Sequence, residues 1–95
     1  MDVVFGDFIW NSHKERANLL KHKVDFKSAA QAFSDPERMI FLDKHHSILE
    51  TRYFCLGCVN GLVLTVRFTY RKGKLRIFGA GYWRKGKGLY EEKTY

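Results

Sequence analysis

The single proline of this chain, Pro36, separates two segments whose apolar residues follow different periods. Before Pro36 they recur at helical spacing, and after it they form runs or alternate, which is typical of strands. A proline disfavours helical geometry in the residue before it, so the last N-terminal helix should end at Asp35. The 95 residues suffice for one domain, residues 1–95. We therefore predict an α+β fold in which two N-terminal helices pack on an antiparallel meander sheet.

Two polar residues indicate where the helices begin. Ser12 stands three residues before Glu15, which is the spacing of a capping box. We expect the first helix to start there and to bury three residues at helical spacing, Ala17, Leu20 and Val24. Asp25 is the predicted N-cap of a second helix over residues 26–33. The apolar stripe expected on that helix is Ala29, Ala30 and Phe33.

The remaining apolar segments predict strands. The expected ranges are 8–10 as an edge strand, then 39–42, 51–56, 62–70 and 75–80. Asn60-Gly61 is the strongest two-residue hairpin turn in the chain, and Lys72-Gly73-Lys74 predicts another turn. Residues 83–93 predict a short C-terminal helix weakened by two glycines. The helices should cover one sheet face, and the other face should carry the cationic side chains. Trp10, Phe33 and Phe41 are expected in the core.

The net charge of +7 arises entirely in the second half of the chain. Residues 1–48 contain as many acids as bases, whereas residues 51–90 contain nine bases and no acid. Such segregation leaves a positive field over one half of the fold, and that field attracts polyanions such as RNA. The alternatives are a soluble protein with a lopsided surface and a protein that binds an anionic membrane. No basic amphipathic helix is evident in the sequence, so we expect no membrane partner.

Targeting segments and cysteines set the expected compartment. No apolar run reaches the roughly 18 residues that span a bilayer, and acids stand where a signal peptide would carry lysines. We expect a cytoplasmic protein whose cysteines are reduced. Cys55 and Cys58 have a metal-binding or redox spacing, but zinc needs four ligands and there is no second such pair. We therefore expect no metal and no cofactor. A zinc or redox protein remains a third hypothesis.

Several short patterns occur in the order found in one family of bacterial toxins. Phe8-Ile9-Trp10 matches an F-x-W opening, and residues 18–24 resemble N-x-x-K-H-G-V, with Lys23 in place of the glycine. Phe26, Ala29-Ala30 and Phe33-Ser34-Asp35 continue that pattern. Three further matches follow: H-x-x-x-E-x-R at His46, Glu50 and Arg52, T-x-R at Thr69-Tyr70-Arg71, and R-I at Arg76-Ile77. Over residues 8–92 the chain thus resembles the BrnT family of RelE-like toxins.

This resemblance implies one RelE-like domain and a type II toxin–antitoxin ribonuclease that cleaves RNA and inhibits translation. It also implies a cognate antitoxin similar to BrnA, a ribbon-helix-helix protein, in a hetero-oligomer; a homodimer is the other assembly considered. Two departures concern the site. Gly79-Ala80-Gly81 stands where the family has S-A-R, and glycines interrupt the charged terminal helix. The alternative function is therefore a non-catalytic module of the same fold that binds nucleic acid or antitoxin.

Arginines are the expected phosphate ligands of a metal-independent ribonuclease. The planar guanidinium meets two phosphoryl oxygens at once and stays charged at any working pH. Arg52, Arg71 and Arg76 lie on three successive predicted strands, so sheet pairing should gather them around the scissile phosphate. Arg84 is the expected substitute for the missing strand-end arginine.

Proton transfer and RNA binding require other groups. Glu50, His46 and Tyr82 are candidates for handling the proton, although Glu50 is equally interpretable as the partner of an arginine. Lysines should position the RNA backbone without reading its sequence, and Tyr70, Tyr82 and Trp83 can stack on unpaired bases. The predicted RNA-binding residues are Arg67, Lys72, Lys74, Tyr82, Lys85 and Lys87.

Overall fold

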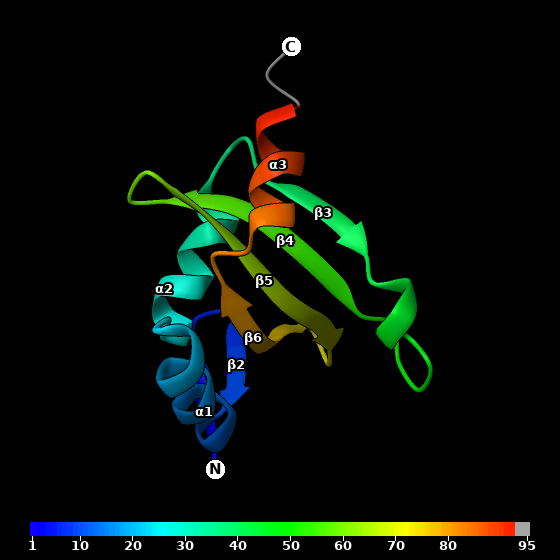
Figure 1. The fold of residues 1–95 in the computed structure, drawn as a ribbon. Helices are drawn as coiled ribbons and strands as arrows, with labels where there is room; N and C mark the ends of the chain where they lie inside the picture. The colour runs from blue at the N-terminus through cyan, green and yellow to red at the C-terminus, as the bar shows by residue number, and fades with distance from the viewer. Residues whose placement is uncertain (93–95) are drawn as a thin grey trace.

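The computed structural model describes residues 1–92, which form an α+β fold with one six-stranded sheet and three α-helices (Figure 1). The strands are β1 Asp2–Phe5, β2 Phe8–Asn11, β3 Met39–Leu42, β4 Tyr53–Val59, β5 Leu62–Arg71 and β6 Lys74–Gly81. The helices are α1 Ser12–His22, α2 Phe26–Gln31 and α3 Arg84–Glu92, with short 3-10 turns at Ala32–Ser34 and Lys44–His46. Lys93, the last residue of the predicted terminal helix, lies outside the described residues. None of the helices described is long and apolar enough to span a bilayer.

The sheet has the strand order β1-β2-β6-β5-β4-β3. The antiparallel meander from β3 to β6 is confirmed. The expectation that residues 8–10 form an edge strand is wrong, because β2 lies between β1 and β6 and pairs with β6 in parallel. The unpredicted strand β1 forms this edge. It folds back on β2 through a tight turn at Gly6, whose φ of 59° suits a residue without a side chain.

Both predicted hairpin turns are present. Asn60 and Gly61 have φ angles of 52° and 83°, and Lys72 and Gly73 have 52° and 79°. Positive φ at both central residues defines the type I′ turn, which matches the twist of paired strands. Strand β4 runs past its predicted end, because Gly57 continues it against the backbone of residue 32.

Gly57 supports a prediction about stability. A β-carbon at this position would lie 2.2 Å from the Ala32 carbonyl oxygen. This is a backbone atom, so it cannot move aside by a change of rotamer. We expect Gly57→Ala to lower the free energy of unfolding by about 3 kcal/mol, as overpacking does. The matched control is Gly88→Ala in α3, where the added β-carbon would have no atom within 4 Å. Its higher helix propensity should raise the free energy of unfolding by about 1 kcal/mol. Urea unfolding of both variants tests this, and equal midpoints would contradict it.

Helix α1 begins differently from the prediction. Its N-cap is Asn11, whose side-chain oxygen accepts hydrogen bonds from the backbone N–H groups of His13 and Lys14. Glu15 does not complete a capping box. Its two oxygens instead accept hydrogen bonds from Trp10 Nε1 and the Phe26 backbone N–H, which ties β2 to the start of α2.

The buried face of α1 is centred on a polar residue. Ala17 is exposed and Leu20 is 72% exposed, so the predicted stripe is wrong, although Val24 is buried. Asn18 is 8% exposed, and its amide donates to the carbonyls of Val24 and Ala80 while its oxygen accepts from the Ala80 N–H. The two bonds to Ala80 attach α1 to β6, and the bond to Val24 holds the segment that follows α1.

Residue Lys23 ends α1 with φ at 61°, the left-handed conformation that favours glycine. The glycine of the N-x-x-K-H-G-V pattern would therefore adopt this conformation without strain. The second predicted cap is confirmed, because the Asp25 carboxylate accepts the Ser28 backbone N–H.

The two sheet faces differ in what covers them. On the first face α1 and α2 pack over the core, where Phe26 meets Trp10 and Phe33 meets Phe68. Strand residues alternate between faces, so Leu56 and Thr65 belong to the second face. Helix α3 crosses that second face in front of β4 and β5 (Figure 1), and Gly86 lets it approach Thr65 closely. Elsewhere on this face Thr69 is 2% exposed and its hydroxyl donates to the Thr51 carbonyl of the loop before β4.

The two cysteines do not form a joint site. Both lie in β4 and are free thiols, although the predicted strand 51–56 would have left Cys58 in the loop that follows it. Three residues apart in a strand, they point to opposite faces. Burial raises the pKa of Cys55 to about 12, which disfavours the thiolate needed for redox or metal chemistry. Within residues 1–92 no group of three or more histidines, cysteines or acids is placed to hold a metal ion.

Candidate active site

Glu50 brings two of the predicted arginines together. Arg71 Nη2 donates to both oxygens of Glu50, at 2.9 and 2.8 Å, and Arg52 Nε lies 3.6 Å from Glu50 Oε1. The hydrogen bond from Arg71 holds the pKa of Glu50 below its ordinary value, so this carboxylate is ionised at neutral pH. Arg52 is also held from the other side, with Cζ 4.2 Å from the centre of the Phe78 ring. Its Nε is buried and has no hydrogen-bond partner in the described chain.

Arg76 lies in the same electrostatic network but has its own partner. Its guanidinium contacts the Asp2 carboxylate, with Nη2 2.8 Å from Oδ2. This contact raises the pKa of Arg76 and lowers that of Asp2. The field of Arg71 further lowers the Asp2 pKa, and the field of Glu50 further raises the Arg76 pKa. Arg76 pairs with Thr69, two residues before Arg71, so both arginines project from the same face.

His46 is oriented by a buried carboxylate that the sequence analysis did not single out. His46 Nδ1 lies 2.9 Å from Oδ2 and 3.1 Å from Oδ1 of Asp43, which is only 3% exposed. A carboxylate accepts hydrogen bonds, so this pairing places the hydrogen on Nδ1 and leaves Nε2 able to accept a proton. The His46 side chain is 52% exposed, so a substrate can reach it.

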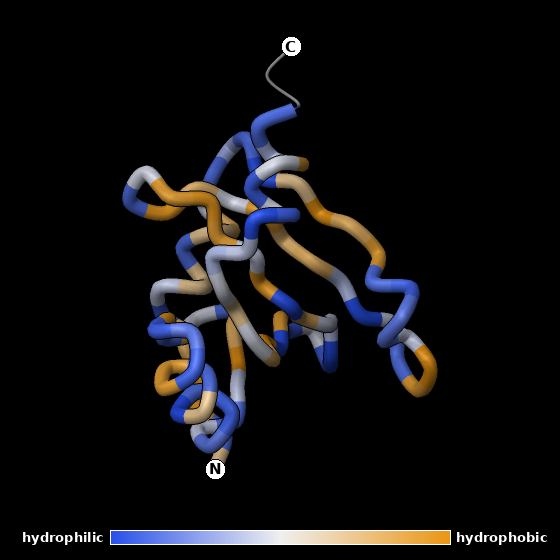
Figure 2. The backbone as a smooth tube through the Cα atoms, viewed as in Figure 1, coloured by the Kyte–Doolittle hydropathy of each residue, from blue (hydrophilic) through white to orange (hydrophobic). Residues whose placement is uncertain are grey.

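The loop that carries these residues is closed at its base. The Asp43 backbone N–H donates to the Arg52 carbonyl at 2.8 Å. Ser47 Oγ donates to the Asp43 carbonyl at 2.6 Å and accepts the Arg52 N–H at 2.9 Å. These bonds fix the two ends of the loop 43–52, while apolar residues occupy its tip (Figure 2).

Four predicted catalytic residues, His46, Glu50, Arg52 and Arg71, thus line one depression. Its volume is about 500 Å³, and we call it the loop pocket. Its lining residues are His45, His46, Ile48, Leu49, Glu50, Arg52 and Arg71. Arg84 is not among them, because it lies at the start of α3 and lines a separate depression with Tyr82 and Lys87. Arg84 therefore does not fill the place that we expected for it.

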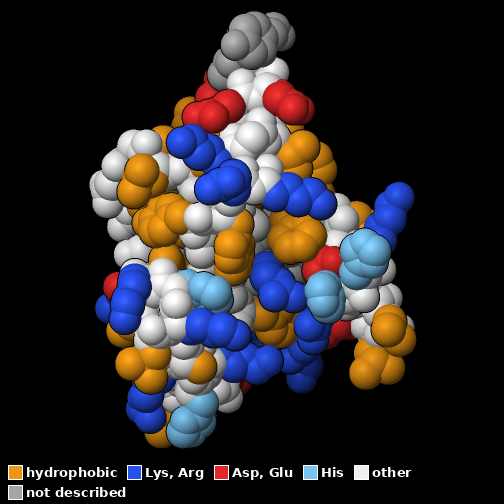
Figure 3. Space-filling model, viewed as in Figure 1, with side chains coloured by type: hydrophobic (Ala, Val, Ile, Leu, Met, Phe, Trp, Pro, Cys, Tyr) orange, Lys and Arg blue, Asp and Glu red, His pale blue; other side chains and the backbone are white. Residues whose placement is uncertain are grey.

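The predicted RNA-binding residues lie on β5, on β6, in the turn between them and at α3. Arg67 projects from the middle of β5, Lys72 lies in the β5–β6 turn, and Lys74 begins β6, where its Nζ donates to the Gly6 carbonyl. Tyr82 is 49% exposed and lies just before α3, whereas Lys85 and Lys87 lie on it. Figure 3 shows Lys and Arg side chains across much of the face on which α3 lies. The residues of this predicted set are not among those that line the loop pocket.

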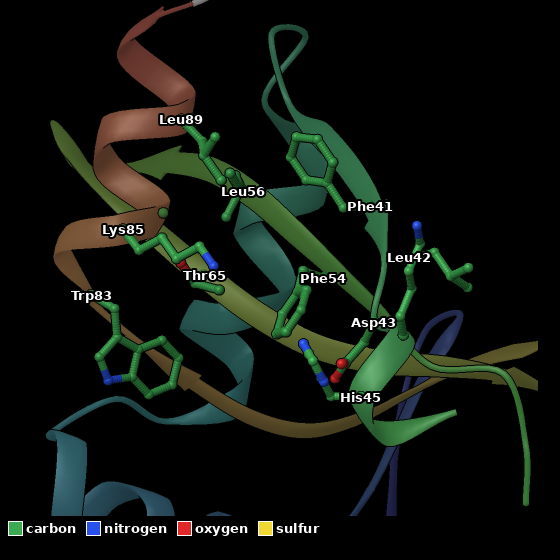
Figure 4. A pocket seen from close by; sticks show the side chains of 12 residues that line it. Phe41, Leu42, Asp43, His45, Phe54, Leu56, Thr65, Trp83, Lys85 and Leu89 are labelled. Atoms are coloured by element: carbon green, nitrogen blue, oxygen red, sulfur yellow. The ribbon is translucent and has the colours of Figure 1, made fainter. Parts of the chain in front are cut away.

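A second depression adjoins the loop pocket and has a mainly apolar and aromatic lining. It has a volume of about 400 Å³ and lies between β3 and α3 (Figure 4). We call it the aromatic groove, and its lining residues are Phe41, Leu42, Asp43, Lys44, His45, Phe54, Leu56, Thr65, Trp83, Lys85, Gly86 and Leu89. The expectation that Phe41 belongs to the core is wrong. It is 36% exposed and forms part of this wall.

A family model described as "Ribonuclease toxin, BrnT, of type II toxin-antitoxin system" matches residues 10–86. The chain belongs to the BrnT family. Membership identifies a ribonuclease toxin of a type II toxin–antitoxin system and implies an antitoxin protein as partner. No curated protein matches the chain.

The matched range of this BrnT toxin includes the entire loop pocket but excludes Asp2, the partner of Arg76. Sequence reasoning missed Asp43 and the aromatic groove. The spacing of Asp43 and His46, three residues apart in a short helical turn, was the available signal for the first. No local signal existed for the groove, because its walls come from β3, β4 and the segment leading into α3.

Proposed function

We propose that this BrnT toxin is a metal-independent endoribonuclease that cleaves RNA in the loop pocket and thereby inhibits translation in the cytoplasm. The observation that carries the proposal is His46, which Asp43 orients into the same pocket as Arg52 and Arg71. The proposed base and the two proposed phosphate ligands therefore line one pocket. The RelE-like fold implied by the resemblance, a BrnA-like ribbon-helix-helix antitoxin and hetero-oligomerisation with it belong to the same proposal.

The chemistry uses a nucleophile that the RNA brings. The 2′-oxygen attacks the neighbouring phosphorus while His46 Nε2 takes the hydroxyl proton. The bond from phosphorus to the 5′-oxygen breaks, and that oxygen takes a proton from solvent. The products are a 2′,3′-cyclic phosphate and a 5′-hydroxyl. Arg52 and Arg71 stabilise the negative charge that builds on the phosphoryl oxygens.

Glu50 has two opposed interpretations in this pocket: it is either the base that takes the proton or the partner that holds the arginines. Its lowered pKa makes it a weaker base, which favours His46 for proton abstraction. The Glu50 carboxylate also occupies the arginines with two anionic oxygens, as a phosphate would. We therefore propose that the scissile phosphate displaces Glu50 from Arg71 when RNA binds.

A non-cleaving module is the second candidate function. The observation that favours it is that carboxylates already pair with Arg71 and Arg76, while Arg84 lies outside the loop pocket. RNA binding without cleavage by the purified toxin would support this candidate over the enzyme.

Chelation of metals tests the proposed mechanism. We expect the rate of RNA cleavage to be unchanged in excess EDTA, because protein side chains, the RNA hydroxyl and solvent supply every group that the reaction uses. Mass spectrometry of the products should find 2′,3′-cyclic phosphate ends. A His46→Ala protein purified in the same way controls for contaminating nucleases. Activity that EDTA abolishes and magnesium restores would refute metal independence.

A further inference from the structure

The aromatic groove is not used by the cleavage chemistry, although it adjoins the site. Phe41 and Phe54 come from neighbouring strands, and Trp83 faces them from the segment before α3 (Figure 4). Aromatic side chains are the usual platforms for unpaired bases, since every base has a π-face. The groove volume of about 400 Å³ is within the range of small-molecule sites.

Two lysines supply positive charge at this apolar groove. Lys44 and Lys85 belong to its lining, and Figure 4 shows the Lys85 side chain reaching into it. Their charges match an anionic backbone.

The groove and the loop pocket share a wall. His45 lines both depressions, and Asp43, which lines the groove, holds His46 in the loop pocket. A ligand with a planar apolar part and an adjacent anionic part can therefore occupy both at once. A nucleotide unit of RNA has this composition. An apolar protein side chain would fill the groove without pairing the lysines.

We propose that the aromatic groove binds one unpaired nucleobase of the RNA strand whose scissile phosphate lies in the loop pocket. This inference rests on the proposed function and adds a base-binding subsite to it. Stacking on Phe54 and Trp83 supplies the affinity.

Mononucleotides test the groove without requiring cleavage. Titration with each of the four nucleoside monophosphates should quench the emission of Trp83, whereas inorganic phosphate should not. Trp10 is 1% exposed and is shielded from contact quenching. A Trp83→Phe protein assigns the signal. Absence of quenching by all four nucleotides would overturn the proposal.

A conservative variant distinguishes a base from an apolar protein segment. Phe54→Leu keeps apolar volume but removes the π-face, so we expect nucleotide binding to weaken about tenfold. Phe5→Leu on the edge strand β1, 43% exposed and outside the groove lining, is the matched control and should bind normally. Unchanged nucleotide binding by Phe54→Leu would overturn the proposal and favour a partner side chain as occupant.

Cleavage and nucleotide-binding measurements distinguish a failure of the base-binding subsite from a failure of the proposed ribonuclease function. If Arg71→Gln abolishes cleavage but Phe54→Leu changes neither cleavage nor nucleotide binding, the subsite is wrong and the ribonuclease stands. If nucleotides quench Trp83 but no RNA is cleaved, the subsite stands and the proposed enzymatic function fails.

Discussion

Replacement of Arg71 with glutamine should reduce the single-turnover rate of RNA cleavage by about 10²- to 10³-fold, the usual effect of losing one preorganised transition-state donor. Arg71 lies at the end of β5 and reaches the loop pocket, where it donates to Glu50. In the proposed mechanism this guanidinium exchanges its hydrogen bonds to Glu50 for hydrogen bonds to the phosphate, and it stabilises the charge that develops there. Growth arrest on induced expression in bacteria should disappear with the activity.

The matched control for this variant is Lys72→Gln. Lys72 is the next residue and carries the same charge, but it lies in the β5–β6 turn and does not line the loop pocket. We expect it to weaken RNA binding modestly and to leave the chemical step intact. The Arg71–Glu50 pair is exposed and contributes less than about 1 kcal/mol, so Arg71→Gln should stay folded. Equal cleavage rates of the two variants would refute the assigned role of Arg71.

Glu50→Gln separates the two interpretations of that carboxylate. If Glu50 only holds the arginines, its neutralisation should tighten RNA binding and preserve cleavage, because the phosphate no longer competes with an anion. Loss of cleavage with unchanged binding would instead make Glu50 the base. Single-turnover rates and affinities for a non-cleavable RNA measure the two effects separately.

Local sequence patterns predicted most elements of this fold. The change of period at Pro36, the Asp25 cap and the Asn60-Gly61 turn were sufficient for both N-terminal helices and for the meander from β3 to β6. These features depend on neighbours in sequence. The parallel pairing of β2 with β6 depends on contacts across more than 60 residues, so no local pattern could indicate it. Strand β1 pairs with β2 in a local hairpin that the sequence analysis did not anticipate.

Polar residues in the core account for the errors in α1. Asn18 looks like a surface residue in a sequence, yet it is buried because β6 supplies both a donor and an acceptor for its amide. Leu20 looks like a core residue and is exposed. Similarly, Glu15 has the spacing of a capping box but bonds to Trp10 and Phe26, since tertiary partners compete with the local one.

The candidate site could be predicted only in part for the same reason. Alternation along β5 placed Arg67 and Arg71 on one face, and pairing with β6 added Arg76. Which arginines meet a carboxylate depends on Asp2 and Glu50, which belong to a distant strand and a loop. The gathering of His46 with Arg52 and Arg71 follows from the closure of the loop 43–52 by backbone bonds, and these bonds leave no trace in composition or periodicity.

Replacement of His46 with alanine should lower the cleavage rate by about 10²- to 10⁴-fold, which is the range that a positioned general base contributes. Single-turnover rates on the same RNA measure this loss. The side chain is half exposed, so its removal should not unfold the protein. His13→Ala, at an exposed histidine of α1 that lines neither depression, is the matched control and should cleave at the unmodified rate.

Asp43→Asn tests how His46 is positioned. The amide keeps the shape of the buried carboxylate, but its NH₂ group can donate to Nδ1 and so shift the imidazole hydrogen to Nε2. His46 would then present a donor to the 2′-hydroxyl, and we expect cleavage to fall by about 10²-fold or more while RNA affinity stays unchanged. A thermal-unfolding scan checks that the variant is folded. Because Asp43 acts only through His46 in this mechanism, the double variant with His46→Ala should be no slower than His46→Ala alone. An additive loss of rate would show that Asp43 has a separate role and that the proposed pairing is not what makes His46 a base.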